Sequence, residues 1–271
     1  MPMVQAGPVS LEYFERGAHA AGEPFVLVHG YRSSARIWDA VQRALAEAGI
    51  RSLAISMRGA GASSVTPDDE HYSAFAFSHD LAAAVDALGL ERFVLVGHSM
   101  GASTVTNYVR DHAERVSALV LLAGGALAPP ATMTPEQEAA WQARIDGYPG
   151  NIDRAYWEAE HAALDADVRA PLWEDWQRVP KQRLRGMRTS PQDLQSVIRT
   201  MAVPTLVVFG DADHTVPPES SVRCYLELPP DVRHLHVFHG VDHSPNAVVP
   251  DRLVGVLRRF VASRVKAVAP V

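Results

Sequence analysis

The chain has 271 residues, of which 47% are hydrophobic and 21% charged, and its formal net charge is −6. These values fit one large folded domain or, less readily, two small ones, and they exclude a disordered chain and a basic nucleic-acid-binding surface. The single cysteine, Cys224, excludes an intramolecular disulfide and favours a reducing compartment, so we expect a cytoplasmic protein. The N-terminal residues lack the basic and apolar pattern of a signal peptide, and no apolar run is long enough to cross a membrane.

Strands and helices alternate along the first part of the chain, which predicts an α/β fold with a mainly parallel sheet and helices on both faces. The expected strands are an edge strand at Val9–Phe14 and buried strands at Pro24–Val28, Arg51–Ser56, Arg92–Val96 and Val116–Leu122. The expected helices cover Ile37–Ala48, Phe75–Leu88 and Ala102–Arg110. After residue 201 the alternation resumes with strands Val203–Phe209 and Val232–Phe238 and helices Pro218–Leu228 and Asn246–Val265.

Residues 124–201 interrupt this alternation with helical periods and no buried strand. We therefore expect a core domain formed by residues 1–123 and 202–271, with residues 124–201 inserted as a helical cap. Several prolines break this segment, and it contains four of the five tryptophans: Trp141, Trp157, Trp173 and Trp176.

The most informative motif is Gly97-His-Ser-Met-Gly101, which lies between a predicted strand and a predicted helix. The pattern G-x-S-x-G in this context is a nucleophile elbow, a tight turn that lifts a serine hydroxyl off the edge of the sheet. The two glycines keep Cβ atoms out of the crowded turn, and the following helix N-terminus favours negative charge. Ser99 is therefore the candidate nucleophile.

A serine nucleophile needs a base, and the base needs an orienting carboxylate. Two loops after later predicted strands supply such groups: Gly210-Asp-Ala-Asp-His-Thr-Val-Pro217 and His239-Gly-Val-Asp-His-Ser244. Both follow the carboxyl ends of strands, where open α/β sheets bind ligands. The order serine, aspartate, histidine is the order of elbow-type hydrolases.

With these motifs the chain resembles the α/β-hydrolase superfamily, in its capped single-domain esterase and lactonase-like branch. His29-Gly30 is similar to the HG signature, and Arg58-Gly-Ala-Gly-Ala-Ser63 to the R-G-x-G-x-S loop. The acidic residue usual two positions before that arginine is Ser56 here. Gly210–Asp213 and Gly240–His243 resemble the segments that carry the family's acid and base.

The resemblance implies a role for each of these residues. Ser99 attacks a carbonyl, His243 accepts and returns the proton, and Asp213 holds the imidazole tautomer. Asp211 is the alternative acid, although the family spacing favours Asp213. The backbone N–H groups of Tyr31 and Met100 are expected to form the oxyanion hole.

The remaining candidates are residues of the substrate pocket and polar residues with expected structural roles. Tyr31, Arg32, Trp141 and Trp157 are candidates for the substrate pocket, with Tyr31 either shaping the wall or lending its hydroxyl to the substrate. His29 is expected to bond within its loop and His98 to point away from the cleft. Asp242 is expected to cap its loop, and Asp80 and Asp86 to be solvated or capping groups on a helix. The histidines at 234, 236, 239 and 243 lack a metal-binding motif, so no metal is expected.

The sequence therefore predicts a cofactor-independent serine hydrolase that cleaves a carboxylic ester or lactone through an acyl-enzyme. We expect it to bind a mostly apolar small-molecule substrate and to bind neither nucleic acid nor a membrane. We expect a monomer or a homodimer. The same triad could instead cleave a C–C bond of the β-diketone type, hydrolyse an amide or thioester, or support perhydrolysis. A ligand receptor that retains the triad is the non-enzymatic alternative. A serine at position 99 argues against dehalogenases and epoxide hydrolases, which the resemblance associates with aspartate there.

Overall fold

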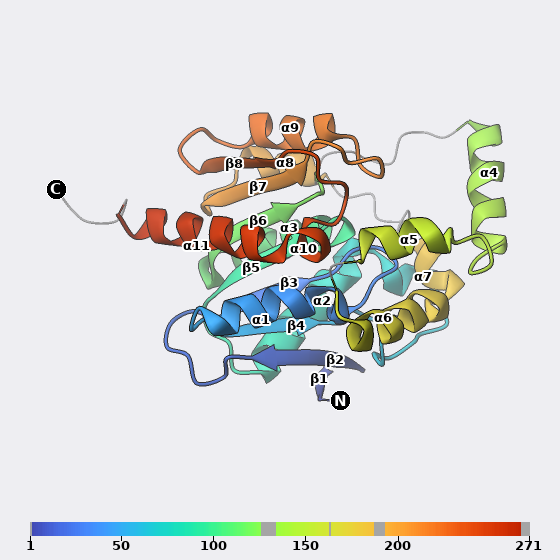
Figure 1. Ribbon diagram of the computed structural model, residues 1–271, viewed down its shortest axis with the longest axis horizontal. Coiled ribbons are helices and arrows are strands. Elements are labelled where there is room, and N and C mark those ends of the chain that lie inside the picture. The colour runs from blue at the N-terminus through green and yellow to red at the C-terminus, as the bar shows by residue number, and fades with distance from the viewer. Residues whose placement is uncertain (1, 126–133, 163, 187–192, 267–271) are drawn as a thin grey trace.

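A single eight-stranded sheet organises the molecule (Figure 1). The computed structural model describes residues 2–125, 134–162, 164–186 and 193–266. The strand order in the sheet is β1-β2-β4-β3-β5-β6-β7-β8. The strands are β1 Met3–Ala6, β2 Val9–Arg16, β3 Phe25–Val28, β4 Ser52–Ile55, β5 Phe93–His98, β6 Val116–Leu122, β7 Thr205–Gly210 and β8 Arg233–Phe238.

The sheet is parallel from β4 to β8 and antiparallel at its N-terminal edge, where β2 pairs with both β1 and β4. The prediction that Val9–Phe14 is the edge strand is therefore wrong, because β1 lies outside it. Gly7 adopts a positive φ of 58°, which lets the chain reverse between β1 and β2. The four residues of β1 are too few to show a clear alternation in the sequence.

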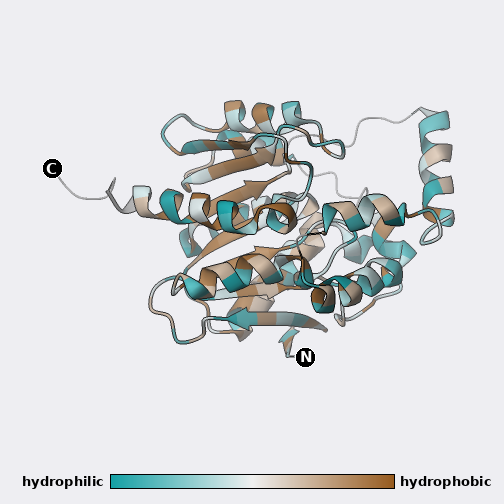
Figure 2. Cartoon of the chain, in the orientation of Figure 1, coloured by the Kyte–Doolittle hydropathy of each residue, from teal (hydrophilic) through white to brown (hydrophobic). Residues whose placement is uncertain are grey.

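Helices cover both faces of the sheet, as the alternating pattern predicts, and Figure 2 shows the apolar strands between their more polar outer surfaces. Side chains of α2, α3 and α9 pack on one face, and side chains of α1 and α11 pack on the other. The helices are α1 Asp39–Glu47, α2 Ala74–Ala87, α3 Met100–His112, α9 Pro218–Glu227, α10 Pro245–Val248 and α11 Pro250–Lys266, with 3-10 turns η1 Ala35–Trp38, η2 Asp69–Tyr72 and η3 Ala113–Arg115.

The described part of residues 124–201 forms helices and no strand. They are α4 Pro135–Asp146, α5 Arg154–Glu160, α6 Ala166–Arg178, α7 Lys181–Gly186 and α8 Leu194–Arg199. Helices α4 to α7 lie together at one end of the molecule (Figure 1). An ion pair between Arg36 and Asp175 joins η1 to α6 at 3.1 Å. Helix α8 packs against α3 and α9, and its Ile198 belongs to the apolar core on the face of the sheet that α2, α3 and α9 cover.

A buried carboxylate accompanies the unusual Ser56. The Ser56 hydroxyl accepts a hydrogen bond from the Ala35 N–H at 3.0 Å and donates one to Glu12 Oε2 at 2.9 Å. Glu12 is fully buried and also pairs with Arg36 at 3.3 Å. An acid from β2 thus lies beside the position where the resemblance expects one, and this network anchors the loop that follows β3.

Asp80 and Asp86 differ in a way that the sequence did not reveal. Asp80 is buried and accepts two hydrogen bonds from Arg58, at 2.9 and 2.6 Å. The prediction of a solvated or capping group is therefore wrong for Asp80. Asp86 is exposed and pairs with Arg115. The buried pair ties the loop after β4 to α2.

Replacing Asp80 with alanine leaves the Arg58 guanidinium buried without its counter-charge, which is expected to lower the free energy of unfolding by about 3 kcal/mol. Asp86→Ala is the control, because an exposed ion pair contributes less than about 1 kcal/mol. Urea denaturation of both variants measures the difference. Equal losses in the two variants would contradict the importance assigned to the buried pair.

Candidate active site

Ser99 lies in a strained turn between β5 and α3. Its φ of 53° and ψ of −118° place a non-glycine residue in a region that side chains rarely adopt. A Cβ at Gly97 would lie 2.4 Å from the Gly101 carbonyl oxygen, and a Cβ at Gly101 would lie 2.6 Å from the Val28 carbonyl oxygen. Both motif glycines are therefore required by close backbone approach. The turn holds the Ser99 hydroxyl at the carboxyl edge of the sheet.

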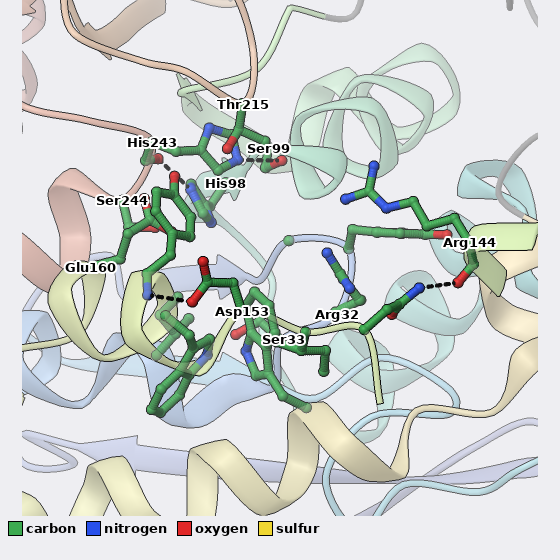
Figure 3. Close-up of a pocket in the computed structure, with 18 residues that line it drawn as sticks. Arg32, Ser33, His98, Ser99, Arg144, Asp153, Glu160, Thr215, His243 and Ser244 are labelled. Atoms are coloured by element: carbon green, nitrogen blue, oxygen red, sulfur yellow. Dashed lines mark hydrogen bonds between the residues drawn. The ribbon is translucent and has the colours of Figure 1, made fainter. Parts of the chain in front are cut away.

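Ser99, His243 and Asp213 form one chain of hydrogen bonds. His243 Nε2 lies 2.9 Å from Ser99 Oγ, and His243 Nδ1 lies 2.8 Å from Asp213 Oδ2 (Figure 3 shows the serine and histidine). The other carboxylate oxygen of Asp213 accepts the backbone N–H groups of Thr215 and Val216 at 2.9 and 2.8 Å. These bonds fix the carboxylate, which in turn orients the imidazole.

The two neighbouring aspartates do not contact the His243 imidazole. Asp211, the alternative acid, accepts hydrogen bonds from His239 Nδ1 at 2.6 Å and the Gly240 N–H at 2.7 Å. Asp242 accepts the backbone N–H groups of His214 and His243 at 2.9 and 2.8 Å, so it caps its loop as predicted. Of the three aspartates in these loops, Asp213 is the one that the fold places on the base.

His98 does not point away from the cleft, contrary to the prediction. It lines the cavity, its ring lies 5.0 Å from the His243 ring, and its Nε2 lies 2.9 Å from the His243 carbonyl oxygen. Burial lowers the pKa of His98 to about 3, so the ring is neutral and Nε2–H donates this bond. His98 thereby fixes the backbone of the candidate base, a contact between residues far apart in the sequence.

The loop after β3 carries the second predicted oxyanion donor. His29 Nδ1 donates to the Gly30 carbonyl at 2.8 Å and Nε2 accepts the Met57 N–H at 3.0 Å, so His29 bonds locally as predicted. Burial lowers the pKa of His29 well below its usual value, which keeps it neutral. Within the described chain, the backbone N–H groups of Tyr31 and Met100 donate to no backbone acceptor. Met100 is the first residue of α3, where an N–H has no partner within the helix.

A cavity of about 280 Å³ opens beside Ser99 and His243. Tyr31, Arg32 and Trp157 line it, as predicted. The Tyr31 hydroxyl donates to the Leu184 carbonyl at 2.9 Å, so it is engaged with α7 and shapes the wall. Trp141 is not among the lining residues, contrary to the prediction, because it packs against the cluster of Ile145, Tyr148, Val179 and Leu184.

Several polar residues that line the cavity were not predicted from the sequence, among them Arg144 and Glu160. Glu160 is buried, and its Oε1 has no hydrogen-bond partner among the residues that the structure describes. Figure 3 shows it on the side of His243. Burial raises the pKa of Glu160 to about 6, and the nearby His243 opposes this effect. The sequence does contain one signal for Glu160: it is three residues after the predicted pocket residue Trp157, so the two side chains share a face of α5.

The histidines near the C-terminus are dispersed. His234 packs against Phe260, His236 against Phe238, and His239 contacts Asp211. Among residues 2–125, 134–162, 164–186 and 193–266, no group of three potential ligands could hold a metal ion. The same residues include no helix that is long and apolar enough to span a bilayer.

Comparisons with known proteins identify the family to which this chain is similar. A family model described as the alpha/beta hydrolase fold matches residues 23–156. A non-heme haloperoxidase of Rhodococcus erythropolis is 30% identical, over 97% of this chain and 100% of the relative. A 2-hydroxy-6-oxo-2,4-heptadienoate hydrolase of Pseudomonas putida is 30% identical, over 89% of this chain and 88% of the relative. The solved structure of a thermophilic esterase from Thermogutta terrifontis superposes with a TM-score of 0.78 at 22% identity, covering 97% of this chain and 98% of that one.

Because burial raises the pKa of Glu160 from 4.5 to about 6, this carboxyl group favours the folded state most below pH 4.5, and the benefit is lost as pH rises through about 6. Glu160→Gln cannot ionise. The free energy of unfolding of this variant, relative to the original protein, is therefore expected to rise by about 1 kcal/mol between pH 4.5 and 7, after allowance for solvent screening.

Urea denaturation at several pH values measures this change. Glu158→Gln, an exposed change on the same helix, is the control and should show no such trend. A Glu160→Gln difference that stays flat or falls over this range would show that Glu160 is not destabilised by burial.

Proposed function

Because the chain belongs to the α/β-hydrolase family, we propose that it is a serine hydrolase that cleaves carboxylic esters or lactones through an acyl-enzyme, without a cofactor. The observation that carries the proposal is the hydrogen-bonded chain Ser99–His243–Asp213 at a strained elbow beside a cavity. Nucleophile, base and orienting acid lie within the distances that acyl transfer requires.

In the first half-reaction Ser99 Oγ attacks the carbonyl carbon while His243 Nε2 takes the hydroxyl proton. Negative charge develops on the carbonyl oxygen, and the N–H groups of Tyr31 and Met100 are the proposed donors to it. The C–O bond then breaks, His243 returns the proton to the departing alkoxide, and the acyl group remains on Ser99. In a lactone the departing hydroxyl stays attached to the acyl chain.

In the second half-reaction a water molecule attacks the acyl-enzyme and His243 takes a proton from it. The tetrahedral intermediate collapses, the carboxylic acid leaves and Ser99 recovers its proton from His243. Asp213 accepts the Nδ1 hydrogen throughout and stabilises the imidazolium, without itself becoming protonated.

The cavity supports a substrate of moderate size with a mostly apolar body. Tyr31, Trp157 and Trp176 contribute aromatic walls, and the cavity volume is about 280 Å³. Residues on α4, α5 and α6 line it together with loops of the sheet domain, which supports a cap formed by these helices, whereas α8, near the end of residues 124–201, packs against α3 and α9.

A second activity on the same residues is perhydrolysis, in which hydrogen peroxide replaces water and the acyl group leaves as a peracid. The name of the Rhodococcus erythropolis relative, a non-heme haloperoxidase, favours including it. The name of the Pseudomonas putida relative likewise keeps hydrolysis of a C–C bond as an alternative. Both reactions use a serine alkoxide or its acyl-enzyme, so the proposed residues are unchanged.

Hydrolysis of p-nitrophenyl esters from acetate to decanoate, with several lactones beside them, tests the proposal. We expect turnover by the original protein and a loss of at least about 10³ in kcat for Ser99→Ala, because the nucleophile is removed. Release of nitrophenol and pH-stat titration are the measurements. Turnover that persists in Ser99→Ala would contradict the proposal, and a folded protein that hydrolyses none of these substrates would favour the C–C cleavage or receptor alternatives.

Asp213→Asn is expected to lower kcat by about 10⁴, because the amide can hold His243 in the wrong tautomer. Asp211→Asn is the matched control two residues away and should lose less than about tenfold, since Asp211 bonds to His239 and Gly240 instead. Steady-state kinetics on the best ester compares them. A larger loss in Asp211→Asn would reverse the assignment of the acid.

A further inference from the structure

Two arginines line the cavity without a carboxylate partner. Arg32 follows the proposed oxyanion donor Tyr31, and Arg144 comes from α4. In the described part of the chain, neither guanidinium forms an ion pair with an acidic side chain. Figure 3 shows both arginines on the side of the cavity opposite Glu160.

Arg32 is held by aromatic rings rather than by an acid. Its guanidinium carbon lies 6.0 Å from the Tyr31 ring centre, 5.9 Å from that of Tyr148 and 5.4 Å from that of Trp176. These rings position the cation through cation–π contacts, and among the pocket residues drawn in Figure 3 no hydrogen bond reaches its guanidinium. Burial and the like charge of Arg144 both lower the pKa of Arg32. A bound anion between the two arginines would oppose both effects on the pKa, because it favours the charged form of the guanidinium.

The acidic residues of the cavity, Asp153 and Glu160, form no ion pair with either arginine in the described part of the chain. Asp153 caps α5 by accepting the Tyr156 N–H at 3.1 Å. Glu160 lies toward His243, on the side of the cavity opposite the two arginines (Figure 3). The cavity therefore has a positive end, made by Arg32 and Arg144, that the chain itself does not neutralise.

We propose that Arg32 and Arg144 form a carboxylate-binding subsite, so that the preferred substrates are esters or lactones bearing a carboxylate remote from the scissile carbonyl. This inference rests on the proposed function for its choice of substrate, but the subsite itself can be tested by binding alone. Guanidinium groups suit a carboxylate because their planar N–H donors match its two oxygens. Aromatic walls around Arg32 reduce its hydration and strengthen the contact.

The test compares phenyl monoesters of adipic, pimelic and suberic acids with the corresponding ω-carboxamides, which have nearly the same shape without the charge. The original protein should hydrolyse the best carboxylate with a kcat/KM about tenfold higher than its carboxamide. Arg144→Gln should reduce this preference to less than about twofold, and raised salt should weaken it. Arg154→Gln is the matched control, because Arg154 lies on the next helix, pairs with Glu158 and does not line the cavity.

Binding to Ser99→Ala supplies a readout that does not depend on turnover. Calorimetry should show methyl hydrogen adipate binding about tenfold more tightly than its ω-carboxamide, and this difference should vanish in Ser99→Ala/Arg144→Gln. If both phenyl esters are hydrolysed equally well with or without Arg144, the subsite is wrong and the proposed function stands. If no ester is hydrolysed but Arg144-dependent carboxylate binding is seen, the subsite stands and the proposed function fails. If neither ester hydrolysis nor Arg144-dependent carboxylate binding is seen, both the proposed function and the proposed subsite are wrong.

Discussion

The strained backbone of Ser99 is the constraint on which the rest of the site depends. A positive φ at a serine persists only because the surrounding chain leaves no other conformation: β5 enters the turn, α3 leaves it, and Gly97 and Gly101 allow backbone contacts that any Cβ would block. The Ser99 N–H is further fixed to the Leu122 carbonyl of β6 at 2.8 Å. The sheet therefore stabilises a conformation that presents one hydroxyl to the cavity.

Buried polar contacts then set the other groups relative to that hydroxyl. His98 fixes the His243 backbone from the strand that carries the nucleophile, and backbone N–H groups hold Asp213. His29 orders the loop of the second oxyanion donor by bonding to Gly30 and Met57. Each contact joins a candidate catalytic group to the sheet, whereas residues of α4, α5 and α6 add charged and aromatic side chains to the cavity. Arg32 connects the two parts, because it lies in the loop after β3 and lines the cavity together with Arg144 of α4.

The sequence predicts seven of the eight strands, most helices and the residues Ser99, Asp213 and His243, because apolar runs and short motifs encode them locally. It does not predict contacts between distant segments. His98 was expected to point away from the cleft, yet it contacts residue 243, and Asp80 was expected to be a solvated or capping group, yet it is buried and pairs with Arg58. Trp141, which was predicted to line the pocket, lies on α4, whose packing no short motif specifies. Arg144 and Glu160 were missed for the same reason.

The most direct test of the account is covalent labelling by a fluorophosphonate, which reacts with a serine only where the hydroxyl is activated and an oxyanion hole is present. Intact mass spectrometry followed by peptide mapping identifies the modified residue. We expect one adduct per chain, on Ser99, and none in Ser99→Ala. A folded protein that acquires no adduct, or an adduct on another serine, would contradict the assignment of Ser99 as the nucleophile.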